Sequence, residues 1–366
     1  MDRPMRSAMM LFPLFVLVVG SFAQAEIRVG IVAPLSGDFA SYGSEIERGA
    51  SLAIEELQQQ NGVKVQLVAE DACLPAAAVA AAKKLLQLDK IDALVGSYCV
   101  IGMVPMAPHF ETAKVIAFHS SAVADEILDA GEYIFTTNVT IDDEAKVAAE
   151  YARKTLGADR AAILFVTSQW GQNYNDSFAR HFKDLGGTVV SSSESSVGTN
   201  DFRAELTRAA AGKPEVLFSA HVGPMMGSVL KQARSLGMKQ TILAPHEAAE
   251  PVVIQSAGGA AEGLTVFAPR LPRDGRGVER FTSSFEKRFG YKPGILAANA
   301  YDATHLAVEA ITACGPDRQC VRDRIYKTKE YHGMSGVFSI TAAGGTVKPF
   351  SRLTVDAGVF REHEGA

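Results

Sequence analysis

The residues with the clearest chemical potential lie together in the segment FHSSA, where His119, Ser120 and Ser121 follow an apolar run. A histidine beside serines is the pairing used in nucleophilic catalysis, with the imidazole as the base for a hydroxyl. In an extended segment neighbouring side chains point to opposite faces, so His119 is poorly placed to act on Ser120. His119 and Ser121 can share a face, but no G-x-S-x-G motif frames either serine. A hydrolase that uses Ser121 is therefore the weaker interpretation, and Ser121 can equally cap a following short helix.

Metal and phosphate chemistry have little support in the residue spacing. The eight histidines show no H-E-x-x-H pattern, and no C-x-x-C occurs. His119, His221 and His246 each lie at the end of a predicted strand or just after it, so a three-histidine metal site stays open as a minor alternative. The segment GGAAEG lacks the strand–turn–helix setting and the Lys-Ser/Thr pair of a phosphate-binding loop. We expect no metal and no organic cofactor.

Short β-branched runs alternate with helical patterns along most of the chain. In the segment 43–62, for example, apolar residues recur at helical spacing before Gly62 ends the pattern. Strands are predicted at 27–35, 63–71, 92–99, 115–121, 160–168, 188–195, 215–220, 241–245, 264–269, 336–340 and 351–360. Such alternation predicts parallel sheets with helices on both faces. The strands are too many for one sheet of ordinary size, so we expect two α/β lobes.

The loops that follow these strands are the expected place for a ligand, because ligands gather at the carboxyl ends of parallel strands. These loops combine aromatic side chains with hydroxyl groups and histidines; the aromatic residues are Phe39, Tyr42, Tyr98 and Trp170. Aromatic walls with a few polar groups are typical of a small-molecule pocket. The net charge of −5 and the pI of about 5.9 give no attraction to nucleic acid, which we exclude as a partner.

The N-terminus and the cysteines both indicate export. Basic residues precede an apolar block and an A-x-A triplet, so residues 1–25 are predicted to be a signal peptide cleaved after Ala25. The four cysteines, an even number, favour disulfides in an exported chain, although three pairings are possible and buried free thiols are the alternative. Cys314 and Cys320 can close a short loop, while Cys73 and Cys99 each follow a strand-like run.

Several segments together resemble one protein family over nearly all of the chain after the signal peptide. They include IRVGIVAPLSGDFASYGSEIERGASLAIEELQQQNG, EDACLPAAAVAAAKKLL, QWGQNY, GSVLKQARSLGMK and NAYDATHLAVEAI. These segments are similar to the type I periplasmic solute-binding proteins of branched-chain amino acid ABC transporters. The resemblance implies two doubly wound parallel-sheet lobes joined by three crossovers, which close on a ligand by a hinge motion. The expected lobes are 26–139 with 269–350, and 140–268 with 351–366.

The resemblance also implies a role and its partners. A monomeric periplasmic protein would bind a small molecule, hand it to the permease subunits of an ABC transporter in the inner membrane, and do no chemistry itself. It further implies that Cys73 pairs with Cys99. The expected ligand is a branched-chain or related amino acid; an amide, a urea or an aromatic acid is the alternative.

The residues of the family's ligand site can be carried over to this sequence one by one. Ser121 takes the position of a hydroxyl that holds the ligand carboxylate together with backbone N–H groups, while a structural role suits the neighbouring candidate Ser120 better. A second hydroxyl position is Val100 here, so only its N–H group could serve. Trp170 would cover the ligand from the second lobe. Tyr42 and Tyr98 match positions that line the side-chain pocket.

The ammonium position departs from the family pattern. His246 stands where an acidic residue usually meets the ammonium group, and Glu247 is next to it. An unpaired buried ammonium group costs several kcal/mol, so three solutions are open. Glu247 turns inward, neutral His246 accepts, or the ligand has no ammonium group. His119 stands where the family has a small residue, and His119, His221 and His246 around a cleft would favour an anion at mildly acidic pH.

Overall fold

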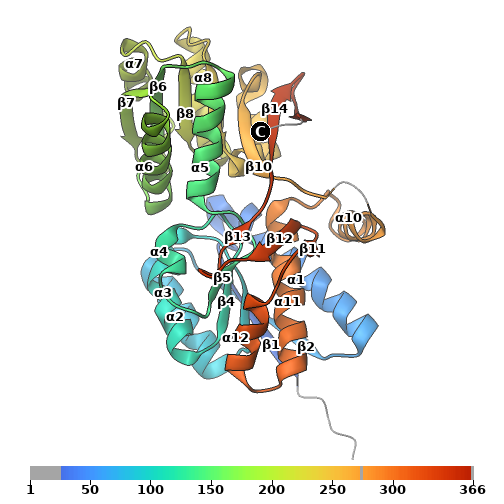
Figure 1. The fold of residues 1–366 in the computed structure, drawn as a ribbon. Coiled ribbons are helices and arrows are strands. Elements are labelled where there is room, and N and C mark those ends of the chain that lie inside the picture. Colours follow the sequence, from blue (N-terminus) through green and yellow to red (C-terminus); the bar gives the residue numbers. More distant parts are fainter. Residues whose placement is uncertain (1–25, 273–274, 364–366) are drawn as a thin grey trace, which may run out of the picture.

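The structure is a computed structural model that describes residues 26–272 and 275–363. The predicted signal peptide lies outside the described residues. The described chain forms two α/β lobes, one above the other in Figure 1. None of the helices in the described ranges is long and apolar enough to cross a membrane.

The first lobe is built on a five-stranded sheet in which all neighbours are parallel. Its spatial order is β2 (Val65–Asp71), β1 (Ile27–Ala33), β3 (Ala93–Ser97), β4 (Ile116–His119) and β5 (Ile134–Thr136). Both faces are apolar, as expected for parallel strands that helices cover on both sides. One face packs on α1 (Ala40–Asn61), α11 (Ile295–Cys314) and α12 (Arg318–Tyr326), and the other on α2 (Pro75–Lys84) and α3 (Val100–Ala113).

The second lobe is built on a seven-stranded sheet whose last two strands are antiparallel additions at one edge. Its order is β15 (Val359–His363), β14 (Phe350–Asp356), β10 (Thr265–Pro269), β9 (Thr241–Pro245), β8 (Val216–Ala220), β6 (Arg160–Val166) and β7 (Thr188–Ser195). One face packs on α5 (Ile141–Glu150) and α6 (Gln169–Asp184). The other packs on α7 (Arg203–Ala211), α8 (Gly223–Ser235) and α9 (Pro251–Ala257). The expected doubly wound α/β architecture is confirmed.

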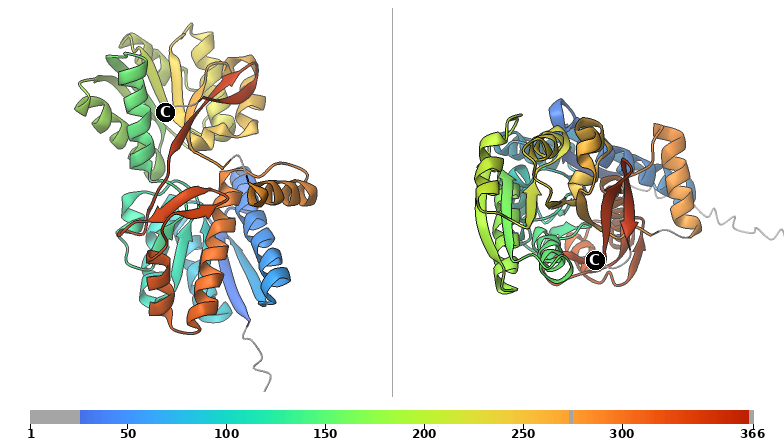
Figure 2. Two further views of the ribbon diagram at one scale, coloured as in Figure 1. Left: turned by 45° about the vertical axis from the view of Figure 1, so that its right-hand side comes forward. Right: turned by 90° about the horizontal axis from the view of Figure 1, so that it is seen from above.

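The chain passes between the two sheets three times. It leaves the first sheet after β5, returns after β10, and leaves again after a small sheet of β11 (Tyr331–Gly333), β12 (Gly336–Ile340) and β13 (Thr346–Val347). Figure 2 shows the last passage as a single strand running from the lower lobe to the upper one. The expected lobe boundaries fall in or at the ends of these passages, and they stay a prediction.

The remaining elements are short or lie at the surface. Helix α10 (Arg276–Phe289) packs its phenylalanines on α1 and α11. The others are α4 (Asp125–Leu128), the 3₁₀ turns Gly37–Phe39, His246–Ala249 and Gly258–Ala261, and the π-helical turns Leu85–Asp89 and Tyr151–Thr155. Cys73 is bonded to Cys99 and Cys314 to Cys320, with Cα atoms 5.3 and 5.7 Å apart. The predicted pairing is thus confirmed.

Candidate functional site

A cavity of ≈ 220 Å³ lies between the lobes, at the carboxyl ends of strands from both sheets. The first lobe contributes Phe39, Cys73, Leu74, Tyr98, Cys99, Val100, Ile101 and Ser121. The second lobe contributes Val166, Thr167, Ser168, Trp170, Val197, His221, Val222 and Met225. Apolar side chains and one disulfide form most of the wall, so the cavity favours an apolar body over a sugar-like polar one. Five predicted site residues line it: Tyr98, Val100, Ser121, Trp170 and His221.

Three helices begin at the wall of this cavity. Val100 is the first residue of α3, Ser168 caps α6 by accepting from the Gly171 N–H at 3.0 Å, and Val222 precedes α8. The first N–H groups of a helix have no partner within it, and the helix dipole places partial positive charge there. These helix starts therefore favour an anionic group in an otherwise apolar cavity.

Ser121, at the inner end of the cavity, is joined across the cleft to Glu247. The Ser121 hydroxyl donates to Glu247 Oε1 at 3.1 Å, and the Ala122 N–H points to the same oxygen at 3.5 Å. Both side chains are almost fully enclosed, with 2% and 3% of their surfaces exposed. Glu247 therefore turns inward, as one of the three expected solutions requires. Its partner in this position is the Ser121 hydroxyl.

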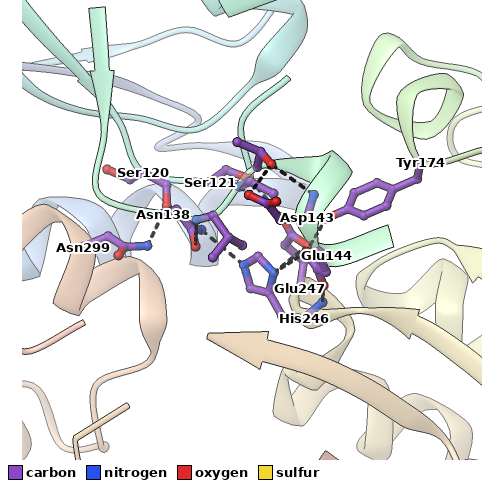
Figure 3. A network of polar contacts seen from close by, with 12 residues as sticks. Ser120, Ser121, Asn138, Asp143, Glu144, Tyr174, His246, Glu247 and Asn299 are labelled. Atoms are coloured by element: carbon purple, nitrogen blue, oxygen red, sulfur yellow. Dashed lines mark hydrogen bonds and ion pairs between the residues drawn. The ribbon is translucent and has the colours of Figure 1, made fainter. Parts of the chain in front are cut away.

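His246 is held by a carboxylate that the sequence did not point to (Figure 3). Glu144, in the first turn of α5, accepts from the His246 backbone N–H at 2.6 Å and lies 2.9 Å from Nδ1. The Tyr174 hydroxyl donates to the same carboxylate. Burial alone would lower the pKa of His246, but the Glu247 and Glu144 carboxylates outweigh it and raise that pKa to about 9. The ring is therefore an imidazolium at neutral pH.

The other ring nitrogen of His246 faces the first crossover between the lobes. Asn138 Nδ2 lies 3.3 Å from His246 Nε2 and donates to the Ser120 carbonyl at 3.1 Å. An amide nitrogen opposite Nε2 suits the neutral ring, since it can donate only to a lone pair. The carboxylate contact on Nδ1 is shorter and carries charge, so it decides in favour of the imidazolium. The contact between Asn138 Nδ2 and His246 Nε2 is then the weaker of the two, because both nitrogens carry protons.

The crossovers themselves are tied together by buried polar groups. Asn299 also donates to the Ser120 carbonyl, at 3.0 Å, and accepts from Lys348 Nζ at 3.2 Å. The Thr346 hydroxyl donates to the Asn138 carbonyl. Ser120 thus contributes its backbone to the junction between the lobes and does not line the cavity.

His119 and His221 are both buried, but they occupy separate sites. His119 Nδ1 lies 2.7 Å from the Ser97 hydroxyl, and the imidazole is outside the cavity lining. His221 lies between the hydroxyls of Ser195 and Ser219, at 2.7 and 3.0 Å. Burial lowers the pKa of each histidine to about 3, so both are neutral at physiological pH. Such neutral rings add no positive charge for an anion.

The three histidines do not come together as a metal site. In the described part of the chain, the group with suitable geometry is Glu144, His246 and Glu247, whose ligand atoms lie within 4.8 Å of one another. Its carboxylates already bind the imidazolium and donors from both lobes, so the hydrogen-bonded arrangement accounts for the cluster without a cation.

Tyr42 and Tyr98 form a stacked pair with ring centroids 4.9 Å apart. Burial raises the pKa of Tyr42, and two further carboxylates, Glu45 from α1 and Glu250 from the second lobe, add to this effect. Burial, together with the Glu250 carboxylate, raises the pKa of Glu45 to about 8. Burial raises that of Glu250 to about 7 against the opposing charge of His246. The region next to Tyr42 therefore holds two carboxyl groups that burial shifts toward the neutral form, in contrast to the largely apolar wall of the cavity.

Comparison with known proteins identifies this arrangement. The family model for periplasmic binding proteins matches residues 26–358. The chain belongs to the periplasmic binding protein family. An amino acid binding protein from Pseudomonas aeruginosa is 29% identical over 287 residues, which are 75% of this chain and 77% of that protein.

Solved structures with the same fold include binders of two kinds of ligand. A leucine binding protein from Thermotoga maritima superposes with a TM-score of 0.85 at 24% identity, over 92% of this chain and 97% of that one. A solute-binding protein from Rhodopseudomonas palustris in complex with benzoate gives 0.84 at 21% identity, over 92% and 95%. Members of this family are solute-binding proteins of the periplasm.

Local patterns in this periplasmic binding protein did not indicate Glu144, Asn138, Glu45 or Glu250. Glu144 follows Thr140-Ile-Asp-Asp143 and looks like an ordinary acidic residue of a helix first turn. One signal could have distinguished it. Glu144 shares its helix face with the buried Ala145 and Ala148 rather than with the solvated positions.

Proposed function

We propose that this protein is the solute-binding component of an ABC importer that captures a small carboxylate with an apolar body. An amino acid of the branched-chain class is the first choice. The observation that carries the proposal is the cavity between the lobes. It is walled mostly by apolar groups from both lobes, and its polar elements include Ser121 and the starts of three helices.

The geometry suggests how such a ligand would be held. Its carboxylate would accept from the Ser121 hydroxyl and from the N–H groups at Ala122 and Val100, where the helix α3 begins. Its apolar body would lie between Trp170 and the Cys73–Cys99 disulfide. Glu247 is the nearest carboxylate to this point and is our candidate partner for the ammonium group.

A second ligand class, the aromatic acids, has support from a specific comparison. The Rhodopseudomonas palustris protein of the same fold is in complex with benzoate. The cavity wall of this protein is apolar enough for a phenyl ring, and Trp170 offers a face for stacking. An aromatic acid would use the carboxylate site and leave Glu247 without a cation.

The partners and the location follow from the family and are part of the same proposal. A monomer exported by cleavage after Ala25 would deliver its ligand to permease subunits in the inner membrane. It would not transform the ligand, because binding and release by hinge motion are sufficient for transport.

Thermal unfolding of the purified protein with a panel of ligands tests the proposal. A ligand at one hundred times its Kd stabilises the folded state by about 2.7 kcal/mol, which is a shift of several degrees. We expect leucine, isoleucine or valine to raise the melting temperature, and Ser121→Ala to abolish the shift. Because this variant also takes a donor from the buried Glu247, its shift is measured against its own ligand-free melting temperature. If aromatic acids alone give a shift, the second class is correct. If none of these carboxylates does, or if a stabilising ligand is turned over, the proposed function is wrong.

A further inference from the structure

The mouth of the cavity is bordered by apolar side chains that are exposed to solvent. Leu74 and Ile101 of the first lobe are 68% and 40% exposed, and Val197 of the second lobe is 57% exposed. All three also line the cavity, so they lie where it opens to solvent, and we call them the apolar rim. Exposed apolar side chains that gather at one place, rather than scattered singly, mark surfaces that contact a ligand or a partner.

The first-lobe part of the apolar rim is held in place by the chain around it. Leu74 follows Cys73 directly and Ile101 stands two residues after Cys99, so the Cys73–Cys99 disulfide ties the two segments together. Each segment also begins a helix, because Leu74 is the N-cap residue of α2 and Ile101 lies in the first turn of α3. A surface that is fixed in advance costs little conformational entropy when a ligand contacts it.

The lining of the cavity determines what kind of group can reach the apolar rim. Among the described residues that line it there is no Asp, Glu, Lys or Arg, and burial keeps His221 neutral by lowering its pKa to about 3. A charged group at the far end of a ligand would lose water here without gaining a partner of opposite charge. An apolar group would extend the contacts with the wall, at a gain in affinity of about fourfold for each fully buried methylene.

The apolar rim is too small to form a protein interface by itself. A stable protein–protein contact buries about 800 Å² on each partner, and three side chains offer only a part of that area. The rim is continuous with the cavity wall and comes from both lobes, as expected for a surface that meets a ligand held between them. The occupant that fits it is therefore the distal end of the ligand.

We propose that Leu74, Ile101 and Val197 form an outer subsite for the distal apolar end of the ligand, and that the protein takes carboxylates whose apolar chain is longer than that of leucine. This inference rests on the proposed function, which places the carboxylate at Ser121, at the inner end of the cavity. A chain that starts there runs between Trp170 and the disulfide and ends at the apolar rim. Leu74 and Val197 are then specificity-determining residues on opposite lobes.

Calorimetric titration with two straight-chain series tests this inference. One series is L-norvaline, L-norleucine, L-2-aminoheptanoate and L-2-aminooctanoate, and the other is the plain carboxylates from pentanoate to octanoate. In the series that binds, we expect the affinity to rise about two- to fourfold with each added methylene, up to the longest chain. An affinity that is highest at five or six carbons and then falls would overturn the inference and leave the proposed function intact.

Variants of the apolar rim locate the contact. Leu74→Ser places a good capping residue at the start of α2, so the fold is retained, and Val197→Ser changes the opposite lobe. In each variant the loss of affinity should grow with chain length and reach about tenfold for the eight-carbon ligand. Leu88→Ser is the matched control, because Leu88 is 73% exposed but lies outside the cavity lining, and its affinities should equal those of the wild type.

The pattern of losses separates the possible occupants of the apolar rim. Losses that grow with chain length in the rim variants, and not in Leu88→Ser, support the inference. Losses that are equal at every chain length would show that the rim residues contact each other or another protein instead of the ligand, and would overturn it, as would the same losses in Leu88→Ser. If neither series binds and L-leucine does not bind either, the proposed function fails and this inference with it.

Discussion

The two halves of the cleft recognise different things. On one side of Ser121 lies an open cavity of apolar side chains and a disulfide, and on the other side lies a closed junction of carboxylates, histidine and amides. Apolar walls bind by area and tolerate changes of shape, whereas a buried ionic network depends on every partner. The difference suggests that the cavity sets the ligand's size and the junction sets its charge.

Removing Glu144 should give the largest effect, because it breaks the junction from within. In Glu144→Ala the imidazolium of His246 and the Tyr174 hydroxyl lose their acceptor, and we expect the free energy of unfolding to fall by about 3–5 kcal/mol. Denaturant unfolding measures this change. Glu150→Ala in the same segment removes only an exposed pair with Lys154 and should cost about 0.5 kcal/mol or less. Equal losses in the two variants would show that the junction is not special.

Truncating Trp170 should affect binding more than folding. Its ring is half-buried at the start of α6 and lines the cavity, so Trp170→Ala removes ligand contact but little of the core. We expect the binding free energy to weaken by about 1–3 kcal/mol for every bound ligand, whether or not the ligand has an ammonium group. Titration with L-leucine and with 4-methylpentanoate, which has the same skeleton without the amine, measures this, and Trp170→Phe should recover part of the loss. A loss confined to amino acids would contradict the division between size and charge.

The smallest expected effect concerns the pH dependence of stability that comes from the buried His119. Burial lowers the pKa of His119 from 6.5 in the unfolded chain to about 3 in the folded protein. As the pH falls, the unfolded chain therefore takes up the proton first. Its contribution to stability is therefore complete above pH 6.5 and is lost as the pH falls toward 3. His119→Asn should reduce proton uptake on unfolding at mildly acidic pH by about one proton. Equal proton uptake by the wild type and His119→Asn would refute a buried neutral His119.

Much of the fold could be predicted from the sequence, because repeating apolar residues and β-branched runs indicate which segments form helices and which form strands. The strand predicted at 188–195 coincides with β7, and the predicted strand at 241–245 with β9. Short elements such as β11 and β13 have too few residues to show a period, and nothing in their sequence predicted them. Their conformation depends on the neighbours on which they pack.

The site was predicted where a residue's own position decides its role, and not where a distant partner does. Ser121 and Trp170 follow strands whose ends meet at the cavity, so their placement could be expected from topology. His119 stands two residues before Ser121, at the end of β4, so strand alternation would put both side chains on one face. The His119 ring instead contacts the Ser97 hydroxyl on the neighbouring strand and does not line the cavity. The pairing of His246 with Glu144 joins residues 102 positions apart, and no local pattern reveals such a contact.

A crystal structure of the protein with L-leucine, or with whichever amino acid binds most tightly, tests the central claim most directly. We predict that the ligand carboxylate accepts from the Ser121 hydroxyl, that the side chain lies in the apolar cavity beside Trp170, and that Glu247 has left Ser121 to contact the ammonium group. A ligand bound elsewhere, with Glu247 still on Ser121, would contradict the account.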